Sequence, residues 1–263
     1  MLNNHRNELA IAIQFVLYLL AFSINGCGST QQATNDTNDD ILIKIDDQNR
    51  IFFRGNITNE TAEQVINLYE EAEEKPDVLL ISSRGGPVEA GLDLAEWIMD
   101  NDIHVEVGAG CASSCANYIF PAGHTKRLSR NSILIWHGSA WQKSFDDRTD
   151  PNSDDYDPLI VKLREREVEF FSALGVDNIL TVYGQKTGVG VRAWLRLVFR
   201  GVQNQGFDYS LDDLKRMGLD NIVLLDGEWN WRDYREDFEP LVRRVSLPDD
   251  YEFQLNRFGA KPE

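Results

Sequence analysis

The sequence predicts an α/β domain in which repeated strand–helix units surround a buried, mainly parallel sheet. Short all-apolar segments such as DVLLIS (77–82) are typical of strands that are covered on both faces. Amphipathic segments of helical period follow these strands, and the alternation occurs three times. With 263 residues and 42% hydrophobic content, the chain is long enough for one such domain with appendages.

The first half of the chain contains most of the expected strands. Thr58 is a candidate N-cap, because a threonine hydroxyl accepts hydrogen bonds from the free amides of a helix start. Pro87 lies in the first turn of the next helix, where a missing N–H is tolerated. In chain order, we expect a hairpin of strands at 41–45 and 51–55, a helix at 58–73, a strand at 77–82, a helix at 87–100, a strand at 103–107, a helix beginning near Ser113, and strands at 126–129 and 132–136.

The second half begins with an acidic segment. Residues 138–158 carry six aspartates and few apolar side chains, which predicts a surface loop or lid. We then expect a helix at 158–174, a short helix at 211–217 and a strand at 221–225. A Gly-x-Gly within 187–205 does not follow a strand and is weak as a phosphate loop. Residues 226–263 form an extension to which the sequence assigns no role.

The N-terminus has the pattern of an export signal. A polar start and an apolar run precede Cys27, so we expect residues 1–26 to be a signal peptide. The Ile-Asn-Gly-Cys ending resembles the bacterial lipobox, which implies that Cys27 is acylated and that residues 27–40 are a flexible tether. Cleavage by the ordinary signal peptidase, or retention as a membrane anchor, stays open because Asn25 is uncommon there.

This pattern implies a place in the bacterial cell envelope. The lipid anchor would hold the domain on the periplasmic side of a membrane. Gly28 follows the cysteine, and by resemblance to enterobacterial sorting this favours the outer membrane.

The net charge and the cysteine content argue against a nucleic-acid partner and against a metal site. The net charge of −17 argues against a nucleic-acid partner, because phosphate binding needs a basic surface. After Cys27, only Cys111 and Cys115 remain, and they either form a disulfide or stay as two buried thiols. Two cysteines without a matching histidine pair supply too few ligands, so no metal site is expected.

Three segments at expected strand ends carry groups suited to chemistry. Gly85 and Gly86 allow a sharp turn whose amides face a substrate oxygen. Ser113 and Ser114 lie at an expected helix start, where a serine is either a nucleophile or an N-cap. His137 ends the most apolar strand and is the best candidate for a general base. Ligands of α/β sheets gather at the carboxyl ends of strands, so the three segments are expected to meet.

These motifs resemble those of the Clp protease proteolytic subunit and its ClpP/crotonase-fold relatives, which include signal peptide peptidase A and small periplasmic Clp-fold serine proteinases. The resemblance covers about residues 41–225. LLISSRGG is similar to the family's oxyanion strand, which implies that role for Gly85 and Gly86. GCASSCANYIFPAG, aligned without gaps to the family's nucleophile segment, implies Ser114 as the nucleophile. NSILIWH is similar to the strand that ends in the base, which implies His137.

Two positions depart from the family pattern. Some exported relatives have a Cys-x-Ser-Ala-Cys segment, and on that register Ser113 is the nucleophile. Gly206 stands where the family has the aspartate of its triad, and Asp208 is the nearest acid. A Ser–His dyad, an orienting group from elsewhere, and loss of activity are each compatible with this departure.

The resemblance implies an exported, lipid-anchored serine hydrolase, a peptidase that acts through an acyl-enzyme without a cofactor. The chain has no G-x-x-x-x-G-K-[ST] segment, so we expect it to work independently of ATP. Its expected partners are peptide or protein substrates, the membrane through the anchor, and further copies of the chain in a homo-oligomer. The alternative is a catalytically inactive lipoprotein of this fold that binds peptides or serves as an envelope scaffold.

Overall fold

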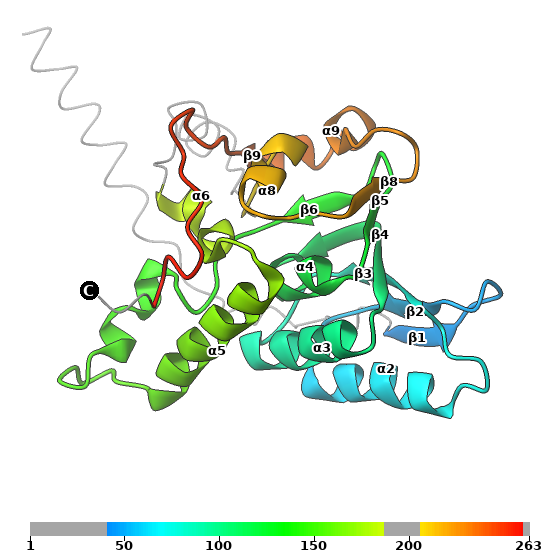
Figure 1. The fold of residues 1–263 in the computed structure, drawn as a ribbon, viewed down its shortest axis with the longest axis horizontal. Coiled ribbons are helices and arrows are strands. Elements are labelled where there is room, and N and C mark those ends of the chain that lie inside the picture. The colour runs from blue at the N-terminus through cyan, green and yellow to red at the C-terminus, as the bar shows by residue number, and fades with distance from the viewer. Residues whose placement is uncertain (1–40, 187–205, 260–263) are drawn as a thin grey trace, which may run out of the picture. The chain divides into compact units, whose positions relative to one another are not determined.

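The computed structural model describes residues 41–186 and 206–259, which belong to one compact unit (Figure 1). Its centre is a sheet in the order β1-β2-β3-β4-β5-β8, with β6 also paired to β4. Among the strand pairs described for this sheet, β1 with β2 is the antiparallel one and the others are parallel, so the predicted mainly parallel sheet is confirmed. The strands are β1 (Leu42–Ile45), β2 (Ile51–Arg54), β3 (Val78–Ser83), β4 (His104–Ala112), β5 (Lys126–Leu128), β6 (Ile133–Ile135) and β8 (Ile222–Leu224).

Three long helices, α2 (Asn59–Glu71), α3 (Val88–Asp100) and α5 (Pro158–Leu174), lie on one side of the sheet (Figure 1). Thr58 caps α2, because its hydroxyl accepts a hydrogen bond from the Thr61 N–H at 3.2 Å. Buried apolar residues of all three helices belong to the same hydrophobic core as those of the strands. Shorter helices are α4 (Phe120–Ala122), α6 (Tyr183–Lys186), α8 (Leu211–Arg216) and α9 (Trp231–Tyr234).

Strand β4 pairs with three other strands of the described sheet and ends directly before the two serines. It continues to Ala112, beyond the expected end at Val107, and it pairs with β3 along one side. On its other side, the first half pairs with β5 and the second half with β6. Ala112 and Ile135 are register partners, so the end of β4 lies beside the end of β6.

The helix expected near Ser113 has a different form. Cys115–Ile119 is a π-helix, in which the Phe120 N–H donates to the Cys115 carbonyl five residues back, and the short α4 continues it. A π-helix holds one residue more than an α-helix over a comparable turn. The residue spacing in this segment is therefore not that of a regular α-helix.

The segment after His137 is only partly a surface loop. Gly138, Ser139 and Ala140 are buried, whereas the acidic residues that follow are mostly exposed and include two short 3₁₀ turns. These three residues can be buried because their polar groups have hydrogen-bond partners inside the protein. The Gly138 carbonyl accepts from Asn117, the Ser139 hydroxyl pairs with that of Thr181, and the Ala140 N–H donates to Glu167.

The C-terminal extension is part of the domain. Its strand β9 (Val242–Arg244) pairs with β7 (Gly206–Asp208) in a second, two-stranded parallel sheet. Trp231, in α9, is 1% exposed. Residues on both sides of position 226 therefore pack against one another in the described part of the chain.

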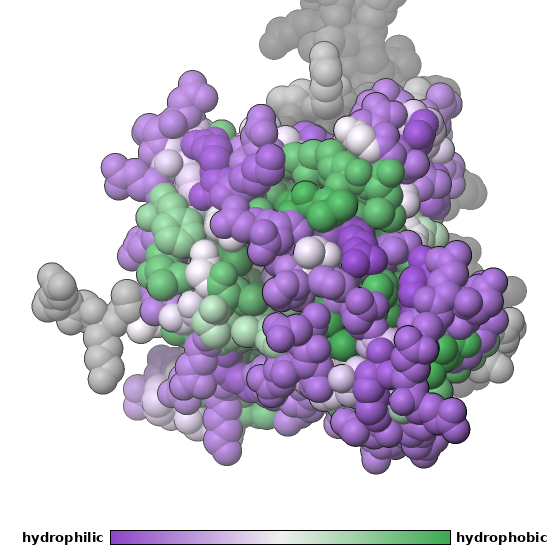
Figure 2. Space-filling model, turned by 45° about the vertical axis from the view of Figure 1, so that its right-hand side comes forward, coloured by the Kyte–Doolittle hydropathy of each residue, from purple (hydrophilic) through white to green (hydrophobic). Residues whose placement is uncertain are grey.

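The face of the protein drawn in Figure 2 is mainly hydrophilic. Figure 2 shows one face of the protein, on which hydrophilic side chains surround separate hydrophobic areas. No helix in the described ranges is long and apolar enough to cross a membrane. The signal peptide 1–26, Cys27, the tether 27–40 and the Gly-x-Gly of 187–205 lie outside the described residues.

Candidate active site

The turn after β3 carries the glycine pair and touches the serine segment. Gly85 has a φ of +90°, a left-handed conformation that glycine adopts without strain. A Cβ at Gly85 would lie 2.5 Å from the Ala112 carbonyl oxygen and 2.8 Å from the Ser114 nitrogen. A Cβ at Gly86 would lie 1.7 Å from the Ile57 carbonyl oxygen. Both positions therefore require glycine.

The two glycine amides differ in their hydrogen bonds. The Gly85 N–H donates to Ser83 Oγ at 3.0 Å. The described part of the chain provides no acceptor for the Gly86 N–H or for the Ser114 N–H at the helix start. These two N–H groups therefore differ from that of Gly85, which already has an acceptor.

Ser113 and Ser114 differ in conformation and exposure. Ser113 is partly exposed and has a φ of +57°, which is uncommon for a residue with a side chain. Ser114 is 2% exposed, and its Oγ donates to the Gly86 carbonyl at 2.6 Å. Ser113 is the more accessible of the two, whereas Ser114 holds the glycine turn.

The π-helix affects which serine a sequence alignment selects. The gapless alignment counts nine residues from Ser114 to Gly123, and the π-helix lies between them. A single inserted residue is the usual origin of a π-turn in a helix. One such insertion here would align Ser113, in place of Ser114, with the nucleophile of the family.

Cys111 and Cys115 form a disulfide with a Cα–Cα distance of 5.2 Å. Cys111 lies in β4 and Cys115 begins the π-helix, so the chain turns between them and brings the two cysteines within reach. The disulfide closes the turn that carries both serines. Within 41–186 and 206–259, no cluster of three or more His, Cys, Asp or Glu side chains is placed to hold a metal ion.

His137 follows β6 at the same edge of the sheet. The Ser113 N–H donates to the Ile135 carbonyl at 2.9 Å, which places His137 two residues after a main-chain partner of Ser113. His137 is exposed, and its carbonyl accepts a hydrogen bond from Gln185 Nε2 at 2.5 Å. Among the residues with described positions, none forms a hydrogen bond with the His137 ring.

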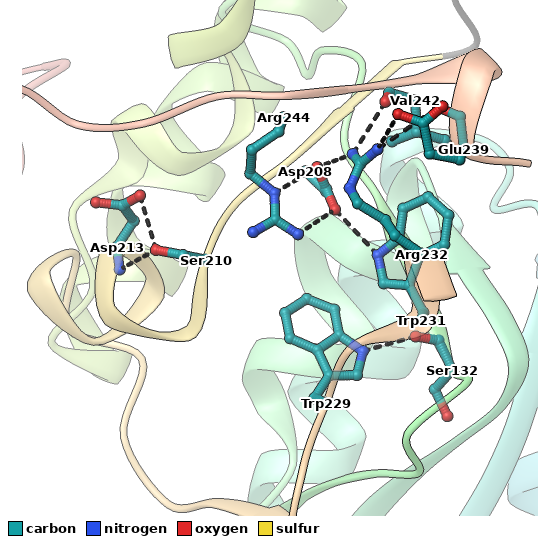
Figure 3. Close-up of polar contacts among 10 residues, drawn as sticks. All are labelled: Ser132, Asp208, Ser210, Asp213, Trp229, Trp231, Arg232, Glu239, Val242 and Arg244. Carbon is teal, nitrogen blue, oxygen red and sulfur yellow. Dashed lines mark hydrogen bonds and ion pairs between the residues drawn. The ribbon is translucent and has the colours of Figure 1, made fainter. Parts of the chain in front are cut away.

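Asp208 has a different role from the one expected. Its carboxylate is fully buried, and every hydrogen bond that it makes within the described residues comes from the C-terminal extension (Figure 3). Trp231 Nε1 donates at 3.0 Å, Arg232 at 2.6 Å and Arg244 through two nitrogens at 3.0 Å. Asp208 therefore binds the extension and is not available to orient His137.

Two buried polar residues beside the site are missing from the sequence-based expectations. Asn117, 1% exposed, donates from Nδ2 to the Gly138 carbonyl at 2.7 Å. Glu167, 0% exposed, accepts hydrogen bonds from the Tyr118 hydroxyl at 2.7 Å and the Ala140 N–H at 2.9 Å. Burial raises the pKa of Glu167 to about 7, and these two hydrogen bonds oppose the rise.

The sequence holds a weak signal for the first of these residues only. Asn117 stands inside the apolar run CANYIF, where a polar side chain needs a buried partner. Glu167 lies in a helix with many charged residues, so nothing in the local pattern sets it apart.

Comparison with known proteins agrees with the predicted fold. Residues 32–147 match the family model described as Clp protease. This range includes the glycine pair, both serines and His137, and it ends before Asp208. The mostly parallel sheet shows an α/β fold, and over the matched residues the chain is similar to Clp proteases. No curated protein matches the chain.

Proposed function

We propose that the protein is a serine hydrolase, and specifically an ATP-independent peptidase that acts through an acyl-enzyme. The observation that carries this proposal is the contact of the Gly85 turn with the Ser113–Ser114 turn at the ends of neighbouring strands. Such a contact sets main-chain N–H groups beside a serine, which is the arrangement that stabilises a tetrahedral oxyanion.

Ser113 is the proposed nucleophile, with Ser114 as the alternative. Ser113 is the more exposed serine, and left-handed backbone at residues other than glycine clusters at active sites. Its Oγ attacks the scissile carbonyl carbon while His137 accepts the hydroxyl proton. The N–H groups of Gly86 and Ser114 hold the oxyanion, whereas the Gly85 N–H is held by Ser83 Oγ and Gly85 shapes the turn. His137 then protonates the leaving amine, and water hydrolyses the acyl-enzyme.

A fluorophosphonate probe tests this assignment. We expect the wild-type protein and Ser114→Ala to be labelled, and Ser113→Gly to be unlabelled. Glycine is the right replacement at position 113 because it adopts a φ of +57° without strain, so loss of labelling reports loss of the hydroxyl. If Ser113→Gly were labelled and Ser114→Ala were not, Ser114 would be the nucleophile.

The location of the protein is a second part of the proposal. The pattern of residues 1–26 supports export, and Cys27 supports acylation, so the domain would face the periplasm from a lipid anchor, with the outer membrane favoured. Incorporation of labelled palmitate that is lost in Cys27→Ala tests the anchor. Homo-oligomer formation is expected from the family resemblance and is checked by light scattering.

An inactive peptide-binding or scaffold lipoprotein is the competing function. It is favoured by one observation: Asp208 is committed to the extension, and no other acid among the described residues hydrogen-bonds His137. An orienting acid contributes several orders of magnitude to the rate of a serine hydrolase. A folded wild-type protein that no fluorophosphonate labels would support this function.

A further inference from the structure

Asn117 connects the serine turn to the residue after the histidine. Its main-chain N–H donates to the Ser113 carbonyl at 2.8 Å, and its side-chain Nδ2 donates to the Gly138 carbonyl at 2.7 Å. Asn117 is 1% exposed, so water does not compete for either hydrogen bond. One buried residue therefore joins two segments that are more than twenty residues apart in the chain.

The main chain around His137 is held on its other sides as well. Gln185 Nε2 binds the His137 carbonyl, and the Ser139 hydroxyl lies 2.9 Å from that of Thr181. Glu167 accepts from the Ala140 N–H and from the hydroxyl of Tyr118, the residue next to Asn117. The segment 137–140 thus has a defined position relative to the π-helix.

The chemistry of the Asn117 side chain indicates that its donor is needed. Its Oδ1 is buried and has no hydrogen-bond partner within the described residues, which costs stability. A leucine, whose side chain has the same number of heavy atoms and the same branching, would avoid this cost if the position served packing alone. The bond to Gly138 is the feature that a leucine would lose.

We infer that Asn117 is a positioning residue that fixes the His137–Gly138 main chain relative to Ser113. This inference rests on the proposed function, because it concerns the distance between the proposed nucleophile and base. Proton transfer requires the two groups at hydrogen-bond distance, and small displacements of either one slow the reaction.

The test compares two variants at Asn117 with one control. Asn117→Leu removes both polar atoms, and Asn117→Asp keeps the size while it replaces the donor with an oxygen that repels the Gly138 carbonyl. Asn178→Leu is the control: Asn178 is also fully buried, and its side chain also binds a main chain, that of Phe258 in the extension. Thermal unfolding first establishes that each variant is folded.

Saturation kinetics of fluorophosphonate labelling separate positioning from binding. In Asn117→Leu and Asn117→Asp, we expect the maximal labelling rate to fall about 10- to 100-fold, with the half-saturating probe concentration unchanged. Asn178→Leu should label at the wild-type rate. Wild-type labelling by both folded Asn117 variants would overturn the inference.

A second measurement decides the inference without catalysis. The chain has four histidines, and His137→Gln identifies the imidazole signals of His137 in an NMR spectrum. These signals should shift or broaden in Asn117→Asp and stay in place in Asn178→Leu. If the wild-type protein is not labelled at all, the proposed function fails. An unchanged His137 spectrum in Asn117→Asp then overturns the positional inference as well, whereas a shift supports it.

Discussion

Gly85 is the single residue on which the geometry of the site depends most directly. Its left-handed φ excludes most side chains, and the Ala112 carbonyl and the Ser114 nitrogen occupy the space that a Cβ would need. Gly227 offers a matched comparison, because its φ is +77° and nothing lies within 4 Å of its Cβ position. The two glycines therefore share the backbone conformation and differ in their surroundings.

Alanine at these two positions separates strain from steric overlap. We expect Gly227→Ala to cost about 1 kcal/mol, the penalty of left-handed backbone, and to keep fluorophosphonate labelling. Gly85→Ala should cost about 3 kcal/mol and abolish labelling, because the serine turn must also move. Denaturant unfolding followed by tryptophan fluorescence measures both costs. If the two substitutions lowered the unfolding free energy equally, the close contact of Gly85 with Ala112 and Ser114 would be contradicted.

Glu167 makes the stability of the protein depend on pH. Burial raises the pKa of its carboxyl from 4.5 to about 7, against the hydrogen bonds from Tyr118 and Ala140 and the charge of Arg164. A carboxyl with a raised folded-state pKa contributes stability below its unfolded pKa. That contribution is lost as the pH rises through the folded pKa.

We expect Glu167→Gln to gain stability relative to the wild type as the pH rises. The difference in unfolding free energy between the two proteins should change by about 3 kcal/mol from pH 4 to pH 8, in favour of the glutamine variant at pH 8. Other groups titrate in both proteins and cancel. Urea unfolding at a series of pH values measures this difference, and a difference independent of pH would show that Glu167 does not titrate in this range.

At the level of elements, the end of β4 and the π-helix act together. Strand β4 continues far enough to pair with β6, and the disulfide between Cys111 and Cys115 ties the last part of this strand to the first residue of the helix. The serines lie inside the short loop that this bond closes. A covalent constraint on so short a segment limits the conformations of the site turn.

Loss of the disulfide should weaken both folding and labelling. For a loop of this length, the chain-entropy model gives a stabilisation of about 2 kcal/mol. Reductant should therefore lower the unfolding free energy of the wild-type protein by that amount and slow its labelling. Cys111→Ala/Cys115→Ala should show the lower stability in oxidising buffer and no response to reductant. If reductant lowered the unfolding free energy of the double variant by the same amount, the disulfide would not be the cause of the loss in the wild-type protein.

On the scale of the whole molecule, the C-terminal extension is held by buried charges. Asp177 accepts hydrogen bonds from the Tyr251 hydroxyl and from Arg257, both at 2.6 Å. Asp208 binds three other side chains of the extension, and Trp229 donates to the Ser132 carbonyl at 2.7 Å, just before β6 (Figure 3). These contacts explain why the extension packs as part of the domain.

Asp208→Asn distinguishes this structural role from a catalytic one. Removing the charge takes the buried carboxylate partner away from Arg232 and Arg244, and we expect a loss of about 3 kcal/mol in unfolding free energy. The labelling rate of the folded variant should stay within about twofold of the wild type. Asp237→Asn is the control, because the Asp237 side chain is 71% exposed and should change stability by less than about 0.5 kcal/mol. If the labelling rate of Asp208→Asn fell by several orders of magnitude, Asp208 would be a catalytic residue that orients His137.

The sequence by itself determined the parts of this protein that depend on local pattern. Apolar strands alternate with amphipathic helices, and this alternation predicted the parallel sheet and placed α2, α3 and α5 within a few residues. The glycine pair was found for the same reason, since two adjacent glycines directly after an apolar strand predict a turn. The order of the segments also indicated that Gly85, the serines and His137 end neighbouring strands.

Only the tertiary structure decided which side chains meet at that edge. The difference in exposure between Ser113 and Ser114 follows from the Gly86 carbonyl, 28 positions away from Ser114 in the chain. The partners of Asp208 come from as far as Arg244, and Asn117 in the π-helix binds the carbonyl of Gly138, 21 positions later in the chain. Local pattern carries no information about such contacts, because they are set by strand length, register and the packing of segments far apart in the chain.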